Sequence, residues 1–499
     1  MENLNKKIVN ATKWSSMTEI IAKLIVPITN MILARVLAPE AFGVVATITM
    51  IISFADMFTD AGFQKYLVQH EFKSEEDRVL ANNVAFWTNF VISVLLWIFI
   101  SIFSDQIAIM VGNPGLGNVI IVACIQLPLT SFSSIQMAIY RRSFDFKTLF
   151  LVRIVGVCMP FIVTIPLAML GYSYWSLIIG TICGNLSNAI ILTIKSKWKP
   201  QYVYKFYVLK EMLSFSIWSL IEAIAIWLTS WIDTFIIGSI LNSYYLGIYK
   251  TSLTSVNAVF ALITSATTPI LFSALSRLQN DNAEFEKMFF NMQKMVSYLV
   301  LPMSVGMFIY ADIVVKILLG DKWPEASGVV SIWSITSGLV IILSHYSSEV
   351  YRAKGKPKLS FVAQTLNLIF IILVCAIASR YDFSTLVNLR AIARLEGILV
   401  HIVFMQFIIG IPALRMLKNI TIPLISSIIM GLIGIKLRQI SLGLSWSIIS
   451  ILICIICYFT ILLCFKTSRE DIKVFIYKLN INEKIKKITK SKRLQMIFK

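Results

Sequence analysis

Charged side chains are scarce in this sequence. Only 14% of its 499 residues are Asp, Glu, Lys or Arg, and 57% are hydrophobic, whereas about 25% charged residues is usual in a soluble domain. A chain so poor in charge cannot cover a soluble protein of this length with groups that water solvates. The composition therefore excludes a soluble enzyme, a disordered chain and a disulfide-rich secreted scaffold, and it indicates a polytopic membrane protein.

Histidine and cysteine are also few, with three and seven residues. Every cysteine lies in an apolar stretch, and the one C-x-x-C pair, Cys454 and Cys457, has neither a second pair nor a nearby histidine. We find no nucleotide-binding lysine loop, no cluster with metal-ligand spacing and no nucleophile–base pattern. The sequence therefore predicts no metal, no cofactor and no catalytic residue, and hence a protein that is not an enzyme.

Apolar runs of membrane-spanning length, about 20 residues, recur along the whole chain. They cover residues 16–37, 41–63, 81–103, 118–139, 148–170, 172–194, 211–239, 246–272, 290–310, 326–350, 359–379, 384–412, 419–435 and 445–465. The sequence thus predicts an all-α polytopic membrane protein with 14 transmembrane helices.

Basic residues give the chain a net charge of +19, and they alternate between loops. They gather before the first span and in every second loop, whereas the loops at 104–117 and 171–175 contain no Lys or Arg. The positive-inside rule then places both termini in the cytoplasm of a multi-pass plasma-membrane protein. Lys436 and Arg438 are a mild exception on the outer side. This distribution accounts for most of the charge without nucleic acid as a partner.

Three segments recur at a nearly constant offset. Residues 37–43 resemble 241–247, residues 112–115 resemble 320–324, and residues 140–147 resemble 351–358. The repeat contains six spans, so both copies have the same orientation, as in transporters built of parallel repeats around a central site. We predict two pseudo-symmetric six-helix lobes (1–199 and 200–414), two extra transmembrane helices (415–465) and a basic cytoplasmic tail (466–499). The tail is either solvated or an amphipathic helix on anionic membrane lipid.

Several of these segments carry family motifs. Residues 33–43 (LARVLAPEAFG), 60–69 (DAGFQKYLVQ) and 171–177 (GYSYWSL) resemble the LARxLxPExFG, DxGfxxxLVQ and GyGxWxL stretches of the polysaccharide transport family, the Wzx-type flippases. Ser173 replaces the usual second glycine of the last stretch. Residues 142–147 fit the family's basic-aromatic loop between spans four and five.

This resemblance implies a MATE-like fold, because the family belongs to the multidrug/oligosaccharidyl-lipid/polysaccharide (MOP) exporter superfamily, which also holds MATE exporters and the lipid II flippase. It implies a substrate as well, an oligosaccharide linked to undecaprenyl pyrophosphate and moved to the outer face for O-antigen, capsule or exopolysaccharide synthesis. Glycosyltransferases and a polysaccharide polymerase are the partners that such a pathway implies.

Ionisable residues at membrane depth normally face a cavity or a partner, so they are the candidate site. A pyrophosphate needs cationic groups, and Lys and Arg donate charge-assisted hydrogen bonds to phosphate. We expect Lys23 and Arg153 to receive the pyrophosphate from the cytoplasmic side. Arg390 and Arg394, four residues apart on one helix face, either attract it in the outward-open state or pair with Glu396 as structure.

Two carboxylates, Glu222 and Asp56, are candidates for ion coupling, because a carboxylate in a low dielectric can exchange a proton near neutral pH. The alternatives are structural pairing with Lys23 or Arg153, and transport driven by membrane potential or by consumption of the product. Charged residues near predicted helix ends are expected to anchor at the interface: Arg35, Asp60, Asp233 and Glu349. The isolated His345 and His401 are expected to be structural.

A MATE-like ion-coupled exporter of small molecules is the main alternative function. An exporter of cationic drugs needs a net acidic cavity, whereas here basic residues within the spans are about as numerous as acidic ones. A membrane-embedded enzyme of polysaccharide synthesis is disfavoured because the sequence has neither a large polar outer loop nor a His-centred site. The duplicated bundle also argues against a scaffold.

Overall fold

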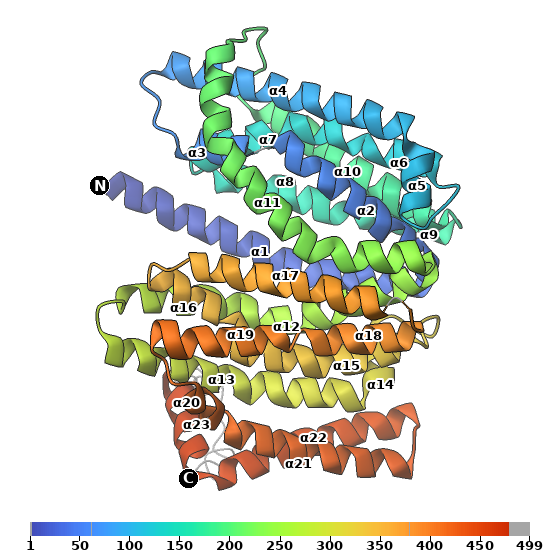
Figure 1. Ribbon diagram of the computed structural model, residues 1–499, viewed down its shortest axis with the longest axis vertical. Helices are drawn as coiled ribbons and strands as arrows, with labels where there is room; N and C mark the ends of the chain where they lie inside the picture. Colours follow the sequence, from blue (N-terminus) through green and yellow to red (C-terminus); the bar gives the residue numbers. More distant parts are fainter. Residues whose placement is uncertain (1, 61, 379, 479–499) are drawn as a thin grey trace, which may run out of the picture. The chain divides into compact units, whose positions relative to one another are not determined.

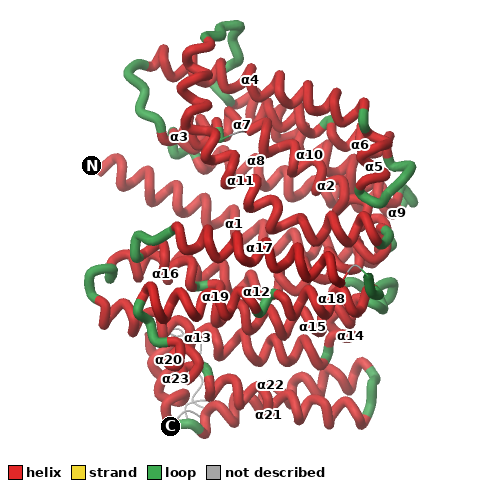
Figure 2. The backbone as a smooth tube through the Cα atoms, in the orientation of Figure 1, coloured by secondary structure: helices red, strands yellow, loops and turns green. Residues whose placement is uncertain are grey.

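The computed structural model describes residues 2–60, 62–378 and 380–478, and these residues are almost entirely helical (Figure 1, Figure 2). No strand occurs in this part of the chain. Within it, 14 segments are long and apolar enough to cross a membrane, and each overlaps one of the predicted spans. The predicted all-α fold with 14 transmembrane helices is confirmed.

Most spans are single helices. These are α1 (Glu2–Val36), α2 (Pro39–Asp60), α4 (Glu75–Ile102), α10 (Ser173–Lys195), α11 (Phe206–Ile240), α12 (Ser243–Arg277), α13 (Asn282–Ile309), α17 (Lys358–Ala378), α21 (Thr421–Ile440) and α22 (Leu444–Cys464). Short helices outside the spans are α3 (Phe63–Gln69), α5 (Ser104–Met110), α14 (Ala311–Leu318), α20 (Ala413–Asn419) and α23 (Lys466–Lys478).

Four spans are interrupted. They are α6 with α7 (Gly117–Cys124, Gln126–Arg142); α8, η1 and α9 (Phe146–Met159, Pro160–Thr164, Ile165–Met169); α15, η2 and α16 (Ala326–Val340, Ile341–His345, Ser347–Ala353); and α18, α19 and η3 (Phe383–Ala393, Glu396–Phe404, Met405–Ile409). The η segments are π-helical turns. One begins at Pro160, whose missing N–H interrupts the regular backbone hydrogen bonds.

Some helices begin well before their apolar runs. The α4 helix starts at Glu75, because the Ser74 side chain accepts a hydrogen bond from the Asp77 N–H at 3.0 Å and three acidic residues occupy the first turn. The α13 helix is capped in the same way by Asp281, which accepts from two backbone N–H groups. Capping residues therefore fix these helix starts, whereas hydropathy finds only the membrane-embedded part.

Contacts divide the chain into two compact units. The first comprises Met1–Leu262, Val314–Trp333 and Lys358–Gly397, and the second comprises Ile263–Ile313, Ser334–Pro357 and the chain from Ile398 onward. The predicted division into two lobes, an extra pair and a tail stays a prediction. Most of the basic residues predicted to lie on membrane lipid fall at 479–499, outside the described residues.

Four spans of the first unit share one core. Ile48 of α2, Ile100 of α4, Leu127 of α7 and Ile178 of α10 belong to a single buried cluster. Figure 1 shows α4, α7 and α10 running beside one another in blue and teal. These apolar contacts fix the spacing of the helices whose polar residues form the cavity described below.

In the second unit, Arg438 is one of the two basic residues that run against the predicted orientation, and it forms an ion pair. Its guanidinium donates to Asp312 Oδ1 and Oδ2 at 2.5 and 2.6 Å, and also to the Ile309 carbonyl at 2.7 Å. The hydrogen bonds from Arg438 lower the pKa of Asp312. This fork-shaped pair joins α21 to the junction of α13 and α14, so the charge of Arg438 has a structural use.

The repeat-related segments at 37–43 and 241–247 pack on each other within the first unit. A Cβ atom added to Gly43 would overlap the Ser243 carbonyl, and one added to Gly247 would overlap the Pro39 carbonyl. The two contacts are equivalent under the repeat, because Gly247 lies 204 positions after Gly43 and Ser243 lies 204 positions after Pro39. The two segments therefore meet through a reciprocal contact of the kind that a two-fold axis produces.

The loops after α5 and α14 repeat this reciprocity. Gly112 (φ 75°) abuts the backbone of Gly238 near the end of α11, and Gly320 (φ 91°) abuts Arg35 near the end of α1. The Trp323 indole N–H also donates to the Ala34 carbonyl at 2.7 Å. Both glycines adopt the left-handed backbone that a side chain would strain. Each copy's loop thus caps the first span of the other copy.

A basic residue also occupies nearly equivalent positions in the two copies, one residue out of register with the alignment of 140–147 on 351–358. In the first unit, Arg142 donates to the carbonyls of Leu67, Val68 and His70 and lies 4.9 Å from the Phe72 ring centroid. In the second unit, the corresponding donor is a lysine. The Lys354 ammonium donates to the Gln279 carbonyl and to Asn282 Oδ1, at 2.9 and 2.7 Å, and lies 4.3 Å from the Phe285 ring centroid. The matched positions are 212 or 213 residues apart, which supports the internal repeat.

We expect Gly43→Ala and Gly247→Ala to destabilise the protein, because the added methyl group meets a rigid backbone carbonyl. Overpacking of this kind costs about 1–3 kcal/mol. Thermal denaturation of the purified protein in detergent should show a lower midpoint for each variant. Gly184→Ala is the matched control, since a Cβ atom there meets nothing within 4 Å. Equal midpoints for all three variants would contradict the close approach.

Candidate functional site

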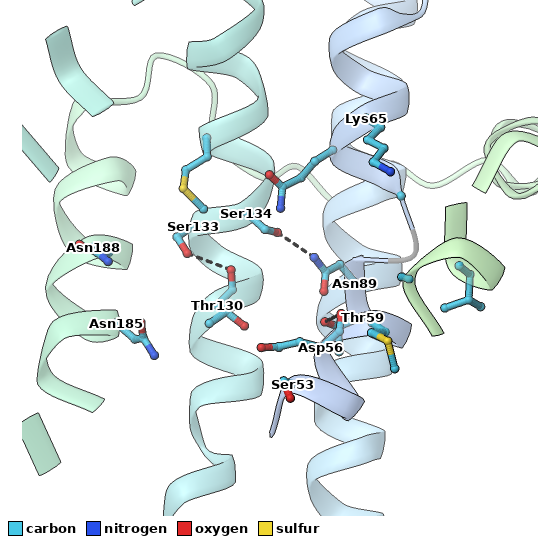
Figure 3. Close-up of a pocket in the computed structure, with 16 residues that line it drawn as sticks. Ser53, Asp56, Thr59, Lys65, Asn89, Thr130, Ser133, Ser134, Asn185 and Asn188 are labelled. Carbon is cyan, nitrogen blue, oxygen red and sulfur yellow. Dashed lines mark hydrogen bonds between the residues drawn. The ribbon is translucent and has the colours of Figure 1, made fainter. Parts of the chain in front are cut away.

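A polar cavity of about 480 Å³ lies among the spans of the first unit. Ser53, Asp56 and Thr59 of α2, Asn89 of α4, Thr130, Ser133 and Ser134 of α7, and Asn185 and Asn188 of α10 line it (Figure 3). The α3 helix contributes Gln64 and Lys65, and Met57, Gly62, Met137, Leu220 and Ala223 complete the wall. Polar side chains are costly at membrane depth, so this concentration in one place indicates a functional cavity.

Hydroxyl groups in the cavity wall use their protons locally. Thr130 Oγ1 donates to the Leu127 carbonyl at 2.9 Å, and Ser133 Oγ donates to the Thr130 carbonyl at 3.0 Å. Ser53 behaves likewise toward the Met50 carbonyl and in addition accepts from the Trp227 indole at 3.0 Å. Such bonds lower the cost of a hydroxyl within a helix. They leave oxygen lone pairs available to a ligand.

Carboxamides complete the polar wall. Asn89 donates to Ser134 Oγ at 2.8 Å, and Asn185 donates to Gln126 Oε1 at 2.9 Å. The side-chain oxygen of Asn188 is buried and has no hydrogen-bond partner among the described residues. Figure 3 shows both α10 asparagines on the cavity side of their helix, facing α7. This oxygen packs toward Gly156 of α8, so Asn188 meets the cavity with the other atoms of its side chain.

A second polar feature of the first unit is a buried ionic cluster. The Arg390 guanidinium lies 3.5 Å from Asp233 Oδ2, and both side chains are less than a tenth exposed. Tyr249 donates its hydroxyl to the same oxygen at 2.8 Å, and the Thr234 N–H donates to Asp233 Oδ1 at 2.7 Å. The Nε and Nη1 atoms of Arg390 make no hydrogen bond within the described residues.

Further cations surround this pair. The Arg394 guanidinium carbon lies 4.1 Å from the centroid of the buried Trp333 ring, and that of Arg390 lies 5.7 Å from it. Lys250 is close enough to interact with Asp233 and lies 4.5 Å from the Trp231 centroid. One carboxylate thus faces three cations, which gives the cluster an excess positive charge.

Lys23 lines a smaller cavity of about 270 Å³, together with Pro27 and residues of α12 and α14. Its ammonium lies 3.5 Å from Glu19 one turn earlier, and its side chain is 38% exposed. Among the described side chains, the acid that pairs with Lys23 is therefore Glu19 and not the expected Asp56. The ammonium remains half open to this cavity.

The other predicted site residues are dispersed. Arg153 of α8 is exposed and lines neither cavity, whereas Asp56 lines the polar cavity. Glu222 lies in α11 and Asp60 ends α2, but the side chains of both are outside the described part of the structure. Of the predicted site residues, Arg390 and Arg394 therefore lie together in the ionic cluster beside Trp333. Lys23, Arg153 and Asp56 do not belong to that cluster.

Three sequence expectations need correction. Asp233 is not an interface anchor, because it is 4% exposed and pairs with Arg390. Glu349 is not an exposed anchor either, because it is 4% exposed and pairs with Arg352. Glu396 makes no ion pair with Arg390 among the described residues, and its Oε2 atom has no hydrogen-bond partner there, whereas its pairing with Arg394 stays a prediction. The anchors were predicted from the distance of each residue to its helix end, which reflects depth in the membrane. Burial of a side chain depends instead on which neighbouring helices pack against it.

The isolated histidines each contact one hydroxyl group in the second unit. His401 Nδ1 lies 2.9 Å from the Tyr351 hydroxyl, and His345 Nε2 lies 3.2 Å from Thr268 Oγ1.

The predicted interface anchor Arg35 is exposed, and its guanidinium donates to the Ile317 carbonyl at 2.7 Å.

The polar cavity itself was not expected from the sequence. Its residues are mostly uncharged Ser, Thr and Asn, each of which is common in membrane helices. A clue was present in α7, where Thr130, Ser131, Ser133 and Ser134 crowd into five positions, and in the pair Asn185 and Asn188 at a one-turn spacing.

Comparison with known proteins decides the family. Residues 32–328 match the family described as polysaccharide biosynthesis protein. The chain belongs to this family. Among its relatives is the teichuronic acid biosynthesis protein TuaB of Bacillus subtilis (strain 168), 22% identical over 87% of this chain and 89% of TuaB. The lipopolysaccharide biosynthesis protein WzxC of Escherichia coli (strain K12) is 20% identical over 72% of each chain.

Solved structures confirm the MATE-like fold of this family member. The lipid II flippase MurJ superposes with a TM-score of 0.75 at 16% identity, covering 93% of this chain and 99% of MurJ. A MATE family multidrug resistance transporter of the MOP superfamily gives a TM-score of 0.57 at 12% identity, covering 82% and 98%. The predicted polysaccharide family is confirmed by the family match, and the predicted MATE-like fold is confirmed by these structures.

We expect Asp233→Asn to lower the thermal stability of the family member, because it leaves buried cations without their carboxylate. Breaking one partner of a buried pair costs about 3–5 kcal/mol. Arg390→Gln should also destabilise, and the double variant should lose clearly less than the sum, as a double-mutant cycle of melting midpoints would show. The control Asp321→Asn removes a solvent-exposed pair with Lys316 and should change little. Additive losses would contradict the coupling.

Proposed function

We propose that this family member is a flippase for undecaprenyl-pyrophosphate-linked oligosaccharide repeat units. It carries them from the cytoplasmic to the outer face of the plasma membrane for synthesis of O-antigen, capsule or exopolysaccharide. The family match is the observation that carries the proposal. The polar cavity within membrane-spanning helices supports it, because a sugar headgroup can cross hydrocarbon only where protein replaces its water.

The pyrophosphate is assigned to the basic residues of the spans. Lys23, half exposed in its cavity, and the exposed Arg153 receive the pyrophosphate from the cytoplasmic side. Arg390 and Arg394 attract it later in the cycle. The unsatisfied N–H groups of Arg390 and the excess of cations around Asp233 support an anion site there.

Transport proceeds by alternating access between an inward-open and an outward-open state. Asp56 and Glu222 are the carboxylates proposed to couple it to an ion gradient. Asp56 lines the polar cavity, so a proton or sodium ion bound there would change the charge that the substrate meets.

Several consequences follow for the surroundings of the protein. The substrate crosses intact, so the protein is not an enzyme and requires no cofactor. Both termini lie in the cytoplasm. Glycosyltransferases on that side supply the lipid-linked oligosaccharide, and a polymerase on the outer side consumes it.

A MATE-like ion-coupled exporter of small molecules is the alternative, favoured by the shared fold. The described cavity lining contains one carboxylate and one ammonium. That balance gives no acidic excess to attract a cationic drug, so the flippase is the better fit.

Deletion of the gene should cause the lipid-linked oligosaccharide to accumulate in the cytoplasmic leaflet, since synthesis continues while export stops. Lys23→Gln and Arg153→Gln should each restore export poorly, because a charge-assisted hydrogen bond contributes about 1.5–3 kcal/mol, or about 10- to 100-fold in affinity. Mass spectrometry of extracted lipids and quantification of surface polysaccharide measure both effects.

The control for these charge changes is Lys287→Gln, which removes an exposed ammonium paired with Glu284 and should restore export fully. Expression must match the wild type in every strain. Normal export by both Lys23→Gln and Arg153→Gln would remove these residues from the site, and the absence of any accumulated lipid in the deletion strain would contradict the flippase itself.

Asp56→Asn should abolish the response of transport to an ion gradient, because the amide cannot bind a proton or balance a cation. Proteoliposomes with imposed proton or sodium gradients would measure the rate at which the lipid-linked oligosaccharide changes leaflet. Asp77→Asn, at the exposed first turn of α4, is the control and should respond as the wild type does. A wild-type rate that ignores both gradients would remove ion coupling from Asp56.

A further inference from the structure

We propose that the polar cavity formed by α2, α4, α7 and α10 binds the uncharged sugar residues of the transported lipid. This assignment rests on the proposed function and divides the substrate between two regions. The basic residues hold the pyrophosphate, and the cavity holds the carbohydrate.

The hydrogen-bonding state of the wall selects a donor-rich ligand. Thr130 and Ser133 donate their hydroxyl protons to backbone carbonyls, so their oxygen atoms can accept hydrogen bonds from a ligand. Ser53 also donates to a backbone carbonyl, and it already accepts one bond from the Trp227 indole. Asn185 donates one amide proton to Gln126 Oε1, which leaves its own side-chain oxygen available to accept. A wall of acceptors pairs best with a ligand that carries many hydroxyl donors, which is the chemistry of a sugar.

The charge of the wall selects a neutral ligand. Among the described lining residues, Asp56 and Lys65 carry opposite charges, so neither an anion nor a cation meets an excess of opposite charge. The described cationic excess lies instead at Lys250, Arg390 and Arg394, and none of these lines the cavity. A pyrophosphate would therefore bind poorly here, because the wall offers it no net positive charge. A neutral sugar does not depend on such charge for its binding.

Size and shape agree with this ligand class. The volume of about 480 Å³ lies in the usual range of small-molecule sites, about 300–1,000 Å³. Met57, Met137 and Leu220 supply apolar wall against which the C–H faces of a sugar ring can pack. Thr59, Ser134 and Asn188 lie toward the ends of their spans that the positive-inside rule assigns to the cytoplasm, the side on which the oligosaccharide is made.

The test compares two probes on the full-length protein in lipid nanodiscs. One is the lipid-linked oligosaccharide extracted from the deletion strain, and the other is undecaprenyl pyrophosphate without sugars. The double variant Asn185→Ala/Asn188→Ala should bind the glycosylated lipid at least tenfold more weakly, since each neutral hydrogen bond lost weakens binding about fivefold. Its affinity for the sugar-free lipid should stay within twofold of the wild type.

Ser133→Ala removes a single oxygen atom from the wall and serves as a second variant, expected to show about a fivefold loss for the glycosylated lipid alone. Ser187→Ala, one position before Asn188 but outside the cavity wall, should bind both probes normally. The sugar site is overturned if Ser133→Ala and the double variant weaken both probes equally or weaken neither. A wild-type protein that binds neither probe would instead contradict the proposed function, whatever the variants do.

Discussion

Hydrocarbon offers no hydrogen-bond partner, and this constraint shapes the protein at every level. The backbone meets it by forming helices, which satisfy their N–H and carbonyl groups internally. Side chains satisfy their polar groups within their own helix, as when Thr130 donates to the Leu127 carbonyl, or between helices, as when Tyr249 and Arg390 both donate to Asp233. Buried polar groups that stay unsatisfied, such as the Asn188 oxygen, are exceptions to this rule.

The internal repeat extends from sequence to contacts. Gly43 and Gly247 approach each other's neighbouring backbone, and Gly112 and Gly320 each cover the end of the other copy's first span. Arg142 and Lys354 also make similar contacts in the two copies. Each donates to a backbone carbonyl and lies beside a phenylalanine ring. Such agreement arises naturally if one six-span unit was duplicated and each half kept the contacts that hold its hairpins.

The sequence was sufficient for the spans because hydropathy is a property of contiguous residues. It was also sufficient to select the family, whose motifs lie largely at helix ends and turns. It was insufficient for the ion pairs. Asp233 and Arg390 lie 157 positions apart, and nothing in the sequence around either residue indicates that the two side chains meet. The cavity escaped for another reason: a search for charged residues passes over Ser133 and Asn185, whose role emerges only when helices distant in sequence are packed together.

The local hydrogen bonds of the cavity hydroxyls bear on how such a transporter changes its preferences. Because Thr130 and Ser133 are satisfied within their own helix, replacing one of them disturbs no bond between helices, whereas Ser53 also accepts from Trp227 of α11. The packing that fixes the spans depends on other residues, such as Ile48 and Leu127. At Thr130 and Ser133, recognition is thus separate from the contacts that hold the helices together, and one scaffold can acquire a new cargo through substitutions there that leave its folding intact.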